Sequence, residues 1–343
     1  MVSVLMNCFA PRFSSHAASE SGARQSARGL TPLVRAAVAT LCGLCAVSAL
    51  TGCSTNPTTG RSQFNALSRE EEIQLGTQGK AEMVKEMGGE VSRVELRNYV
   101  TEIGLKLVET AKLRDPSLGD LPWEFTLLDS DVVNAFAMPG GKVFMSMGLA
   151  RKMTNEAQLA GVLGHEVGHV AARHVNDRFS RAMGTQIGAV IIGAVLGSEQ
   201  IGQLAGSFGE IATKGFDRDQ ESESDELGMW YMERAGYNPI GMRQVMEILA
   251  SLAGEGREPE FLSTHPYPET RIKLIDERMA NEFASWKSRP TEGLKPAEFN
   301  ARFLSKIASA YPVGRPEDPE VRRFAMGPMG KVACDHSTCG HAH

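Results

Sequence analysis

The stretch His165-Glu166-Val167-Gly168-His169 is the part of this sequence from which the rest can be interpreted. On an α-helix, residues i and i+4 lie about 40° apart around the axis, so His165 and His169 can offer imidazole nitrogens to one metal ion. A histidine pair at this spacing favours tetrahedral zinc. Glu166 points elsewhere and can take a proton from a water at the open coordination position. We therefore predict one Zn²⁺ ion per subunit, with His165 and His169 as ligands and Glu166 as the catalytic base.

The helix that carries this stretch is predicted to begin after Asn155, a typical N-cap residue, and to continue to about residue 178. Gly161, Gly164 and Gly168 fall on one stripe of it, at i, i+3 and i+7. Inside a helix, glycine costs about 1 kcal/mol relative to alanine. Three glycines on one stripe therefore predict that another backbone packs very close to this helix.

The segments on either side of this helix predict the fold class. Apolar residues recur at helical spacing over residues 68–114, with a break at 88–89, and again over 219–235, 240–253 and 269–286. Three runs that lean towards β-structure lie between, at residues 123–128, 132–137 and 143–147, with a turn at 139–141. The expected fold is α+β, mainly helical, with a small antiparallel sheet.

A catalytic zinc ion needs a third protein ligand, and the acidic run over residues 217–225 supplies candidates. Glu221 and Asp225 lie at i and i+4, hence on one helix face. Glu221 would bind the metal, while Asp225 would accept the second ring N–H of a histidine ligand. On bare chemistry, Glu223 could compete as the ligand, and acidic runs are more often solvated helix faces than metal sites.

Four motifs occur in order along the chain: Asn134-Ala-Phe-Ala-Met-Pro-Gly-Gly141, the stretch His165 to His169, Arg218-Asp-Gln-Glu-Ser-Glu-Ser-Asp225, and Thr264-His265-Pro266 followed by Arg271-Ile272. Together they resemble the HtpX-like and CAAX-prenyl-protease-like family of zinc metallopeptidases, of the gluzincin type, in its periplasmic lipoprotein branch. The resemblance covers about residues 65–285. It implies a zincin-type metallopeptidase domain.

The resemblance also implies roles for particular residues. It makes Glu221 the third ligand, supported by Asp225, and so decides against Glu223. His265 and Arg271 match a pair thought to approach the metal and to stabilise the oxyanion of the tetrahedral intermediate. The edge strand that hydrogen-bonds an extended substrate corresponds to Asn134, Ala135, Phe136, Ala137 and Met138. The spanning helices of the membrane-embedded family members are missing, which argues against prenylated or transmembrane substrates.

The N-terminal region has the pattern of an export signal. An apolar run of about 15 residues, 36–50, follows Arg28 and Arg35 and is shorter than the roughly 20 residues of a membrane-spanning helix. It ends in Leu50-Thr51-Gly52-Cys53, which resembles a bacterial lipobox, so Cys53 is the predicted site of lipidation. Ser54, where some lipoproteins have aspartate, favours the outer membrane. We therefore expect a periplasmic protein held on a membrane by lipid.

Domain boundaries follow from these assignments. We expect a lipoprotein signal peptide with a long n-region over residues 1–52, a tether over 53–65, the zinc metallopeptidase domain over 66–286 and a partly disordered C-terminal extension over 287–343. The apolar run 187–196 spans about ten residues, too few to cross a bilayer, and predicts a buried or groove-lining helical segment. His174, five residues and about 140° beyond His169 on one helix, is interpreted as structural.

Composition excludes several classes of protein. The net charge of −5 is spread along the chain without a basic block, so a nucleic-acid partner is not expected. Four of the six cysteines precede residue 54 and the other two are in the last ten residues, so no disulfide framework holds the body together. The Cys334 to His343 tail could at most scavenge metal.

The function predicted is that of a zinc metalloendopeptidase acting on misfolded or misassembled envelope proteins. The alternative is a mainly non-catalytic assembly factor that binds client strands in the same cleft. Intact Glu166 argues against this alternative, since a pure binder has no use for a general base.

Overall fold

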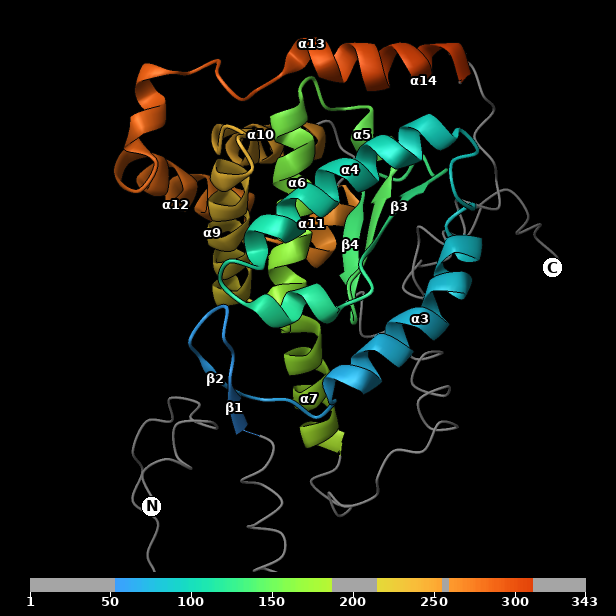
Figure 1. Cartoon of the computed structure of the whole chain (residues 1–343), viewed down its shortest axis with the longest axis vertical. Coiled ribbons are helices and arrows are strands. Elements are labelled where there is room, and N and C mark those ends of the chain that lie inside the picture. Colours follow the sequence, from blue (N-terminus) through green and yellow to red (C-terminus); the bar gives the residue numbers. More distant parts are fainter. Residues whose placement is uncertain (1–52, 187–214, 255–258, 311–343) are drawn as a thin grey trace, which may run out of the picture.

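The structure, a computed structural model, describes residues 53–186, 215–254 and 259–310 (Figure 1). The α-helices in chain order are α3 (Arg69–Glu86), α4 (Val94–Ala111), α5 (Met147–Ala150), α6 (Glu156–Ala171), α7 (His174–Gln186), α9 (Arg218–Arg234), α10 (Ile240–Gly254), α11 (Glu260–Thr264), α12 (Pro268–Asn281), α13 (Pro296–Phe299) and α14 (Ser305–Ala310). The strands are β1 (Cys53–Thr55), β2 (Ser62–Phe64), β3 (Glu124–Leu128), β4 (Ala135–Met138) and β5 (Lys142–Ser146). The remaining helical segments are η2 (Pro116–Asp120), η3 (Ala284–Ser288) and η4 (Asn300–Leu304), the last of them π-helical. The mainly helical α+β class predicted from the sequence is confirmed.

Three features named above lie outside the described residues: the signal peptide, the apolar run 187–196 and the tail rich in cysteine and histidine. Within the part of the chain that the structure describes, no helix combines the length and the apolar character needed to cross a bilayer.

The three-stranded sheet has the order β3-β5-β4. β4 and β5 form the antiparallel pair expected around residues 139–141, where Gly140 and Gly141 adopt φ angles of 73° and 81°, accessible to glycine without strain. β3 instead pairs with β5 in parallel. This sheet is therefore mixed, and the antiparallel pairing predicted from the sequence holds for β4 and β5 but not for β3. β5 is buried along its whole length, which suits it to the centre of the sheet.

α6 is buried along its whole length and packs directly on α9. The Asn155 side chain accepts a hydrogen bond from Gln158 N at 3.0 Å and caps the helix as predicted. A Cβ added at Gly168 would lie 3.0 Å from Ser224 O, and one at Gly164 would lie 3.2 Å from Gly228 O. The close backbone approach predicted from the glycine stripe is confirmed. This close approach lets side chains from α6 and α9 reach the same point.

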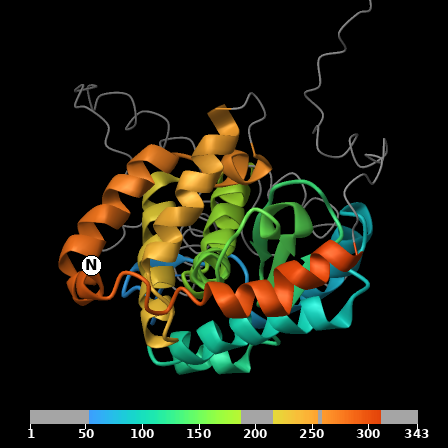
Figure 2. The ribbon, with the colours of Figure 1, turned by 90° about the horizontal axis from the view of Figure 1, so that it is seen from above.

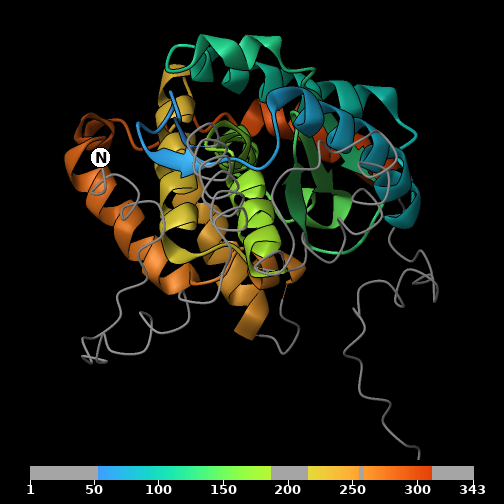
Figure 3. The same ribbon diagram turned by 90° about the horizontal axis from the view of Figure 1, so that it is seen from below.

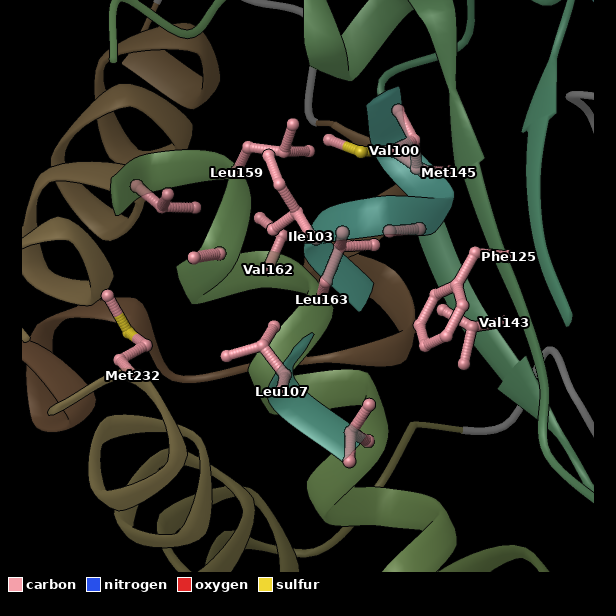
Figure 4. Packing of buried hydrophobic residues seen from close by; sticks show 14 of the residues in the cluster. Val100, Ile103, Leu107, Phe125, Val143, Met145, Leu159, Val162, Leu163 and Met232 are labelled. Carbon is pink, nitrogen blue, oxygen red and sulfur yellow. The ribbon is translucent and has the colours of Figure 1, made fainter. Parts of the chain in front are cut away.

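The main hydrophobic core lies between α4, α6 and the sheet (Figure 4). Helical spacing on α4 places Val100, Ile103 and Leu107 in the same buried cluster as Leu163 of α6 and Val143 of β5. Each such side chain contributes about 1.5–3 kcal/mol when it is fully buried. This core holds the apolar side chains of α6 and so positions the polar side chains near the C-terminal end of the helix.

Residues 53–65, predicted to be a tether, form an antiparallel hairpin of β1 and β2 that packs on the helices. Asn56 Oδ1 accepts a hydrogen bond from Thr58 N at 2.8 Å, and its Nδ2 donates to Ala171 O, at the end of α6, at 3.0 Å. Figures 1 and 3 show this N-terminal hairpin beside α7. The polar, turn-forming residues resemble those of a linker because turns and linkers use the same residue types.

The single helix predicted over residues 155–178 is two helices, α6 and α7, because the chain turns at Arg173. Arg173 has a φ of 57°, in the left-handed region that a helix cannot continue through. Its guanidinium donates to Glu72 Oε1 at 3.0 Å and to Leu67 O at 2.8 Å. Both partners lie far away in the sequence, so no local pattern signals the break.

Residues 287–310, predicted to begin an extension, complete the hydrophobic core. Figure 2 shows α13 and α14 lying along α4. Phe299 and Phe303 are fully buried, with ring centroids 6.3 Å and 5.7 Å from that of Tyr99. The domain boundary predicted at residue 286 therefore does not mark the end of the packed structure.

Candidate metal centre

Four buried side chains from three helical segments converge on one point. His165 and His169 come from α6, Glu221 from α9, and His265 from the C-cap of α11. One nitrogen or oxygen from each lies within 4.8 Å of the others. His165 Nε2 lies 3.0 Å from His169 Nε2, and the Glu221 carboxylate oxygens lie 3.4 Å from His169 Nε2 and 3.5 Å from His165 Nε2.

These separations fit a tetrahedral zinc ion. With bonds of about 2.0–2.1 Å, two ligand atoms of a zinc tetrahedron lie roughly 3.3 Å apart. Two imidazole Nε2 atoms that face each other bring their lone pairs together, an arrangement that a shared cation stabilises. His165, His169 and Glu221 therefore have both the chemistry and the spacing for Zn²⁺, with His265 as a fourth donor atom.

Glu166 has the environment of a proton acceptor. Its carboxyl is wholly buried, and neither oxygen has a hydrogen-bond partner in the described part of the chain. His265 Nε2 lies 3.5 Å from Glu166 Oε1. Burial raises the pKa of this carboxyl, which favours proton uptake. An unpartnered buried carboxylate is costly, so it indicates a group that acts on a ligand.

Asp225 lies where the sequence placed it, behind His165. Asp225 Oδ1 accepts from His165 Nδ1 at 2.9 Å, which leaves His165 Nε2 free to face the metal position. Burial alone would raise the pKa of Asp225, but the hydrogen-bonded Arg271 guanidinium outweighs it and lowers the pKa. Asp225 therefore remains a carboxylate and a hydrogen-bond acceptor.

Arg271 lies against two buried carboxylates of the site. Its Nη1 lies 2.7 Å from Glu221 Oε2, and its Nε and Nη2 donate to Asp225 at 2.7 Å and 2.6 Å. The side chain is 2% exposed. The guanidinium is thus occupied by two buried carboxylates whose charge it balances. The oxyanion role that the resemblance implied stays a prediction for Arg271, and its contacts in this structure position Glu221 and Asp225.

His265 lies among the donor atoms, at the C-cap of α11, where backbone and ring contacts hold it. Its backbone N–H donates to Phe261 O at 2.7 Å, and its ring stacks on Phe261 with centroids 4.3 Å apart. His265 Nδ1 lies 3.0 Å from Glu221 Oε1 and 3.2 Å from His165 Nε2. These contacts hold the imidazole among the other donor atoms.

His174 and Glu223 have positions that sequence reasoning missed. The turn at Arg173 brings His174 Nδ1 to 2.9 Å from His169 Nδ1, on the side away from the metal position. Glu223, the rival ligand, faces outwards, with Oε2 at 2.9 Å from His174 Nε2. Burial lowers the pKa of His174, and the hydrogen bond to Glu223 opposes this only in part. The one signal in the sequence was the third histidine, five residues after His169.

The segment predicted to bind substrate forms an edge of the sheet. β4 comprises Ala135–Met138 and pairs with β5 on one side, while no strand among the described residues pairs with its other side. It packs near α6. Asn134, just before it, donates through its side chain to Glu260 Oε1 at 3.2 Å. β4 therefore lies beside the helix that carries the metal donors, with one edge unpaired by any strand of the described residues.

The fold and the site define the class of a gluzincin-type metallopeptidase: an H-E-x-x-H helix, a glutamate ligand from a later helix, and a strand edge beside them. Residues 95–279 match peptidase family M48. The chain belongs to this family of zinc metallopeptidases.

Three relatives whose names describe proteases agree with this assignment. The beta-barrel assembly-enhancing protease of Escherichia coli (strain K12) is 33% identical over 233 residues, 64% of this chain and 46% of the relative. The metalloprotease LoiP of the same strain is 32% identical over 184 residues, 52% of this chain and 72% of LoiP. The mitochondrial metalloendopeptidase OMA1 of Saccharomyces cerevisiae is 30% identical over 262 residues, 71% of this chain and 75% of OMA1. The chain spans about half the length of the first of these.

Proposed function

We propose that this protein is a zinc-dependent metalloendopeptidase that hydrolyses peptide bonds of misfolded or misassembled cell-envelope proteins. The observation that carries this proposal is the buried carboxyl of Glu166, without a hydrogen-bond partner among the described residues, beside the converging donors His165, His169 and Glu221. That arrangement supports hydrolysis by an activated water better than simple metal storage, which needs no base.

The protein's own residues have distinct parts in this reaction. Zinc, when bound, polarises the scissile carbonyl and lowers the pKa of the attacking water. Glu166 accepts the proton of that water and delivers it to the leaving nitrogen. Asp225 holds the ring of His165, and Arg271 holds the carboxylates of Glu221 and Asp225. His265 Nε2, 3.5 Å from Glu166, is available to donate to an oxyanion.

The free edge of β4 supports binding of the substrate as an extended strand. Backbone hydrogen bonds to such an edge accept many sequences, since they do not read side chains. This would suit an enzyme that acts on proteins exposing unpaired strands. The name of the beta-barrel assembly-enhancing protease, which joins assembly of β-barrels with proteolysis, favours substrates of this kind and also a role in assembly.

We place the protein in the periplasm, on a membrane, through lipid on Cys53, with the outer membrane favoured by Ser54. The lipobox-like Leu50-Thr51-Gly52-Cys53 supports this placement. Cys53 is also the first residue of β1, so an anchor at this position would join the folded domain without a long tether.

Substitution of the base tests the proposed activity. The Glu166→Gln variant should keep its zinc, because Glu166 is not a ligand, and should lose casein cleavage by about 10²–10⁴-fold, the usual contribution of a general base. Cleavage by the wild type should stop when zinc is removed by a chelator and return when zinc is restored. A variant that still turns over, or cleavage by the wild type that is indifferent to chelator, would contradict the roles given to Glu166 and zinc. A wild type that does not cleave casein would favour the non-catalytic assembly factor.

A further inference from the structure

A chain of polar contacts leads from the N-terminal hairpin to a metal donor. Arg61, just before β2, places Nη2 at 2.8 Å from Glu223 Oε2 on α9. The same Glu223 oxygen lies 2.9 Å from His174 Nε2, at the start of α7. His174 Nδ1 in turn lies 2.9 Å from His169 Nδ1. Four side chains, one from the N-terminal hairpin and one from each of α9, α7 and α6, are thus connected in series.

The carboxylate of Glu223 determines which nitrogens carry hydrogen in this series of contacts. An ionised carboxylate can only accept, so the hydrogen in its contact with His174 must be on Nε2. A neutral imidazole carries one ring hydrogen, which leaves His174 Nδ1 as an acceptor. The Ser224 hydroxyl, 3.2 Å away, can donate to the same nitrogen. The hydrogen between the two imidazoles therefore belongs to His169 Nδ1.

With its hydrogen on Nδ1, His169 has its lone pair on Nε2. That nitrogen is the one that lies 3.0 Å from His165 Nε2 and 3.4 Å from Glu221 Oε1. Asp225 acts on His165 in the same way but directly, at 2.9 Å. The two histidine donors of α6 are therefore each held by a carboxylate, His165 directly and His169 through His174.

We propose that Arg61, Glu223 and His174 form a positioning relay, which fixes His169 in the tautomer whose Nε2 faces the metal. The N-terminal hairpin is then part of the metal site. This inference rests on the proposed function in so far as zinc is the metal held. Partners of this kind commonly change metal affinity by about 10–100-fold, although they never touch the ion.

The hairpin is held close enough to take part in the relay. Asn56 donates to Ala171 O at 3.0 Å, at the C-terminal end of the helix that carries His169. Arg61 and Glu223 are partly exposed, 40% and 20%, whereas His174 is fully buried. Because water screens an exposed pair, the effect should decrease outwards from His174 to Glu223 and Arg61.

Zinc affinity of the full chain, measured by competition with a chromophoric chelator, tests the relay without relying on catalysis. His174→Phe removes the acceptor and should weaken zinc binding by about 10–100-fold. His174→Asn can place Oδ1 where Nδ1 was, and should recover part of that loss. Glu223→Ala should weaken binding less, and Arg61→Ala least.

Two matched variants control for general effects. Glu226 lies on the same helix as Glu223 and pairs with Arg278 of α12, so Glu226→Ala removes a carboxylate outside the relay. Arg97→Ala removes a guanidinium of similar exposure that pairs with Glu90, away from the site. Both should bind zinc as the wild type does. Equal losses in these controls and in the relay variants would overturn the relay.

Histidine tautomers in the zinc-loaded wild type give a test that needs no variant. Long-range ¹H–¹⁵N spectra should show His169 and His174 neutral, with hydrogen on Nδ1 of His169 and on Nε2 of His174. A hydrogen on Nδ1 of His174, or unchanged zinc affinity in His174→Phe, would overturn the relay while leaving the peptidase intact. Failure of the wild type to bind zinc would instead overturn the proposed function, and the relay with it.

Discussion

The position of His265 among the metal donors allows it either to restrain or to assist catalysis. Its ring is stacked on Phe261, and its Nδ1 lies 3.0 Å from Glu221 and 3.2 Å from His165. From there it can serve in two ways. It can occupy a coordination position that a substrate or water needs, or it can donate from Nε2 to an oxyanion. The two roles predict opposite effects of its removal.

We expect His265→Ala to raise the rate of casein cleavage, and to make the protein cleave itself, because the imidazole lies among the donors in this structure. Initial rates of the variant and the wild type, at equal zinc content, measure this. A fall in kcat by about 10²-fold would instead assign His265 to the oxyanion, the usual loss for one such donor. Equal rates would remove it from the site.

Sequence reasoning at the residue scale worked where the geometry is local. The spacing of His165 and His169, and of Glu221 and Asp225, determines which helix face they share, and the structure brings these faces together. His174 was assigned a structural role because a continuous helix would turn it away. The turn at Arg173 depends on distant partners and brings His174 against His169, although His174 is not among the converging metal donors.

At the scale of elements, the contact between α6 and α9 sets the distance between the donors. Gly228 of α9 faces α6, where a Cβ would lie 2.9 Å from His165 N and 2.9 Å from Gly164 C. The sequence showed the glycines of α6, because they form a stripe, but a lone glycine on α9 gives no such pattern. The parallel pairing of β3 was likewise hidden, since strand order depends on tertiary packing.

Gly228→Ala should push α9 away from α6 and so move Glu221 relative to His165. Alanine is the better helix former by about 1 kcal/mol, but a forced backbone shift in a packed core costs about 1–3 kcal/mol. We expect a lower melting temperature together with weaker zinc binding. Thermal unfolding of the zinc-free and zinc-loaded forms measures both.

Gly161→Ala is the matched comparison, because its Cβ would meet Met242 on α10, 3.2 Å away, and not α9. Gly161→Ala should change the melting temperature with little effect on zinc affinity. The same loss of zinc affinity in both variants would show that the α6–α9 distance has no specific role in zinc binding.

At the scale of the whole molecule, segments from the two ends of the described chain enclose the peptidase core. The N-terminal hairpin packs at the C-terminal end of α6, and the C-terminal helices cover α4 (Figures 1 and 2). Sequence composition predicted a tether and an extension in these places. Neither local polarity nor proline spacing reveals the buried contacts of Asn56, Phe299 and Phe303, which depend on residues far along the chain.

Cys53→Ala should abolish lipidation and leave the precursor uncleaved by the lipoprotein signal peptidase. Metabolic labelling with a radioactive fatty acid, followed by gel electrophoresis, measures both. Cys45→Ala, within the predicted signal peptide, should be labelled as the wild type is. Label that persists in Cys53→Ala would place the anchor elsewhere.

The contact between Arg61 and Glu223 also determines when, during synthesis, the site can take its final form. A ribosome makes residue 61 long before residue 223, and the hairpin cannot close on Glu223 or on Ala171 until those residues have been made. Pairings this distant form late, because the intervening chain loses entropy when its ends meet. His169 is therefore without its full set of partners until Glu223 has been made. A nascent chain carries an immature site, and the delay comes from the order of the sequence itself.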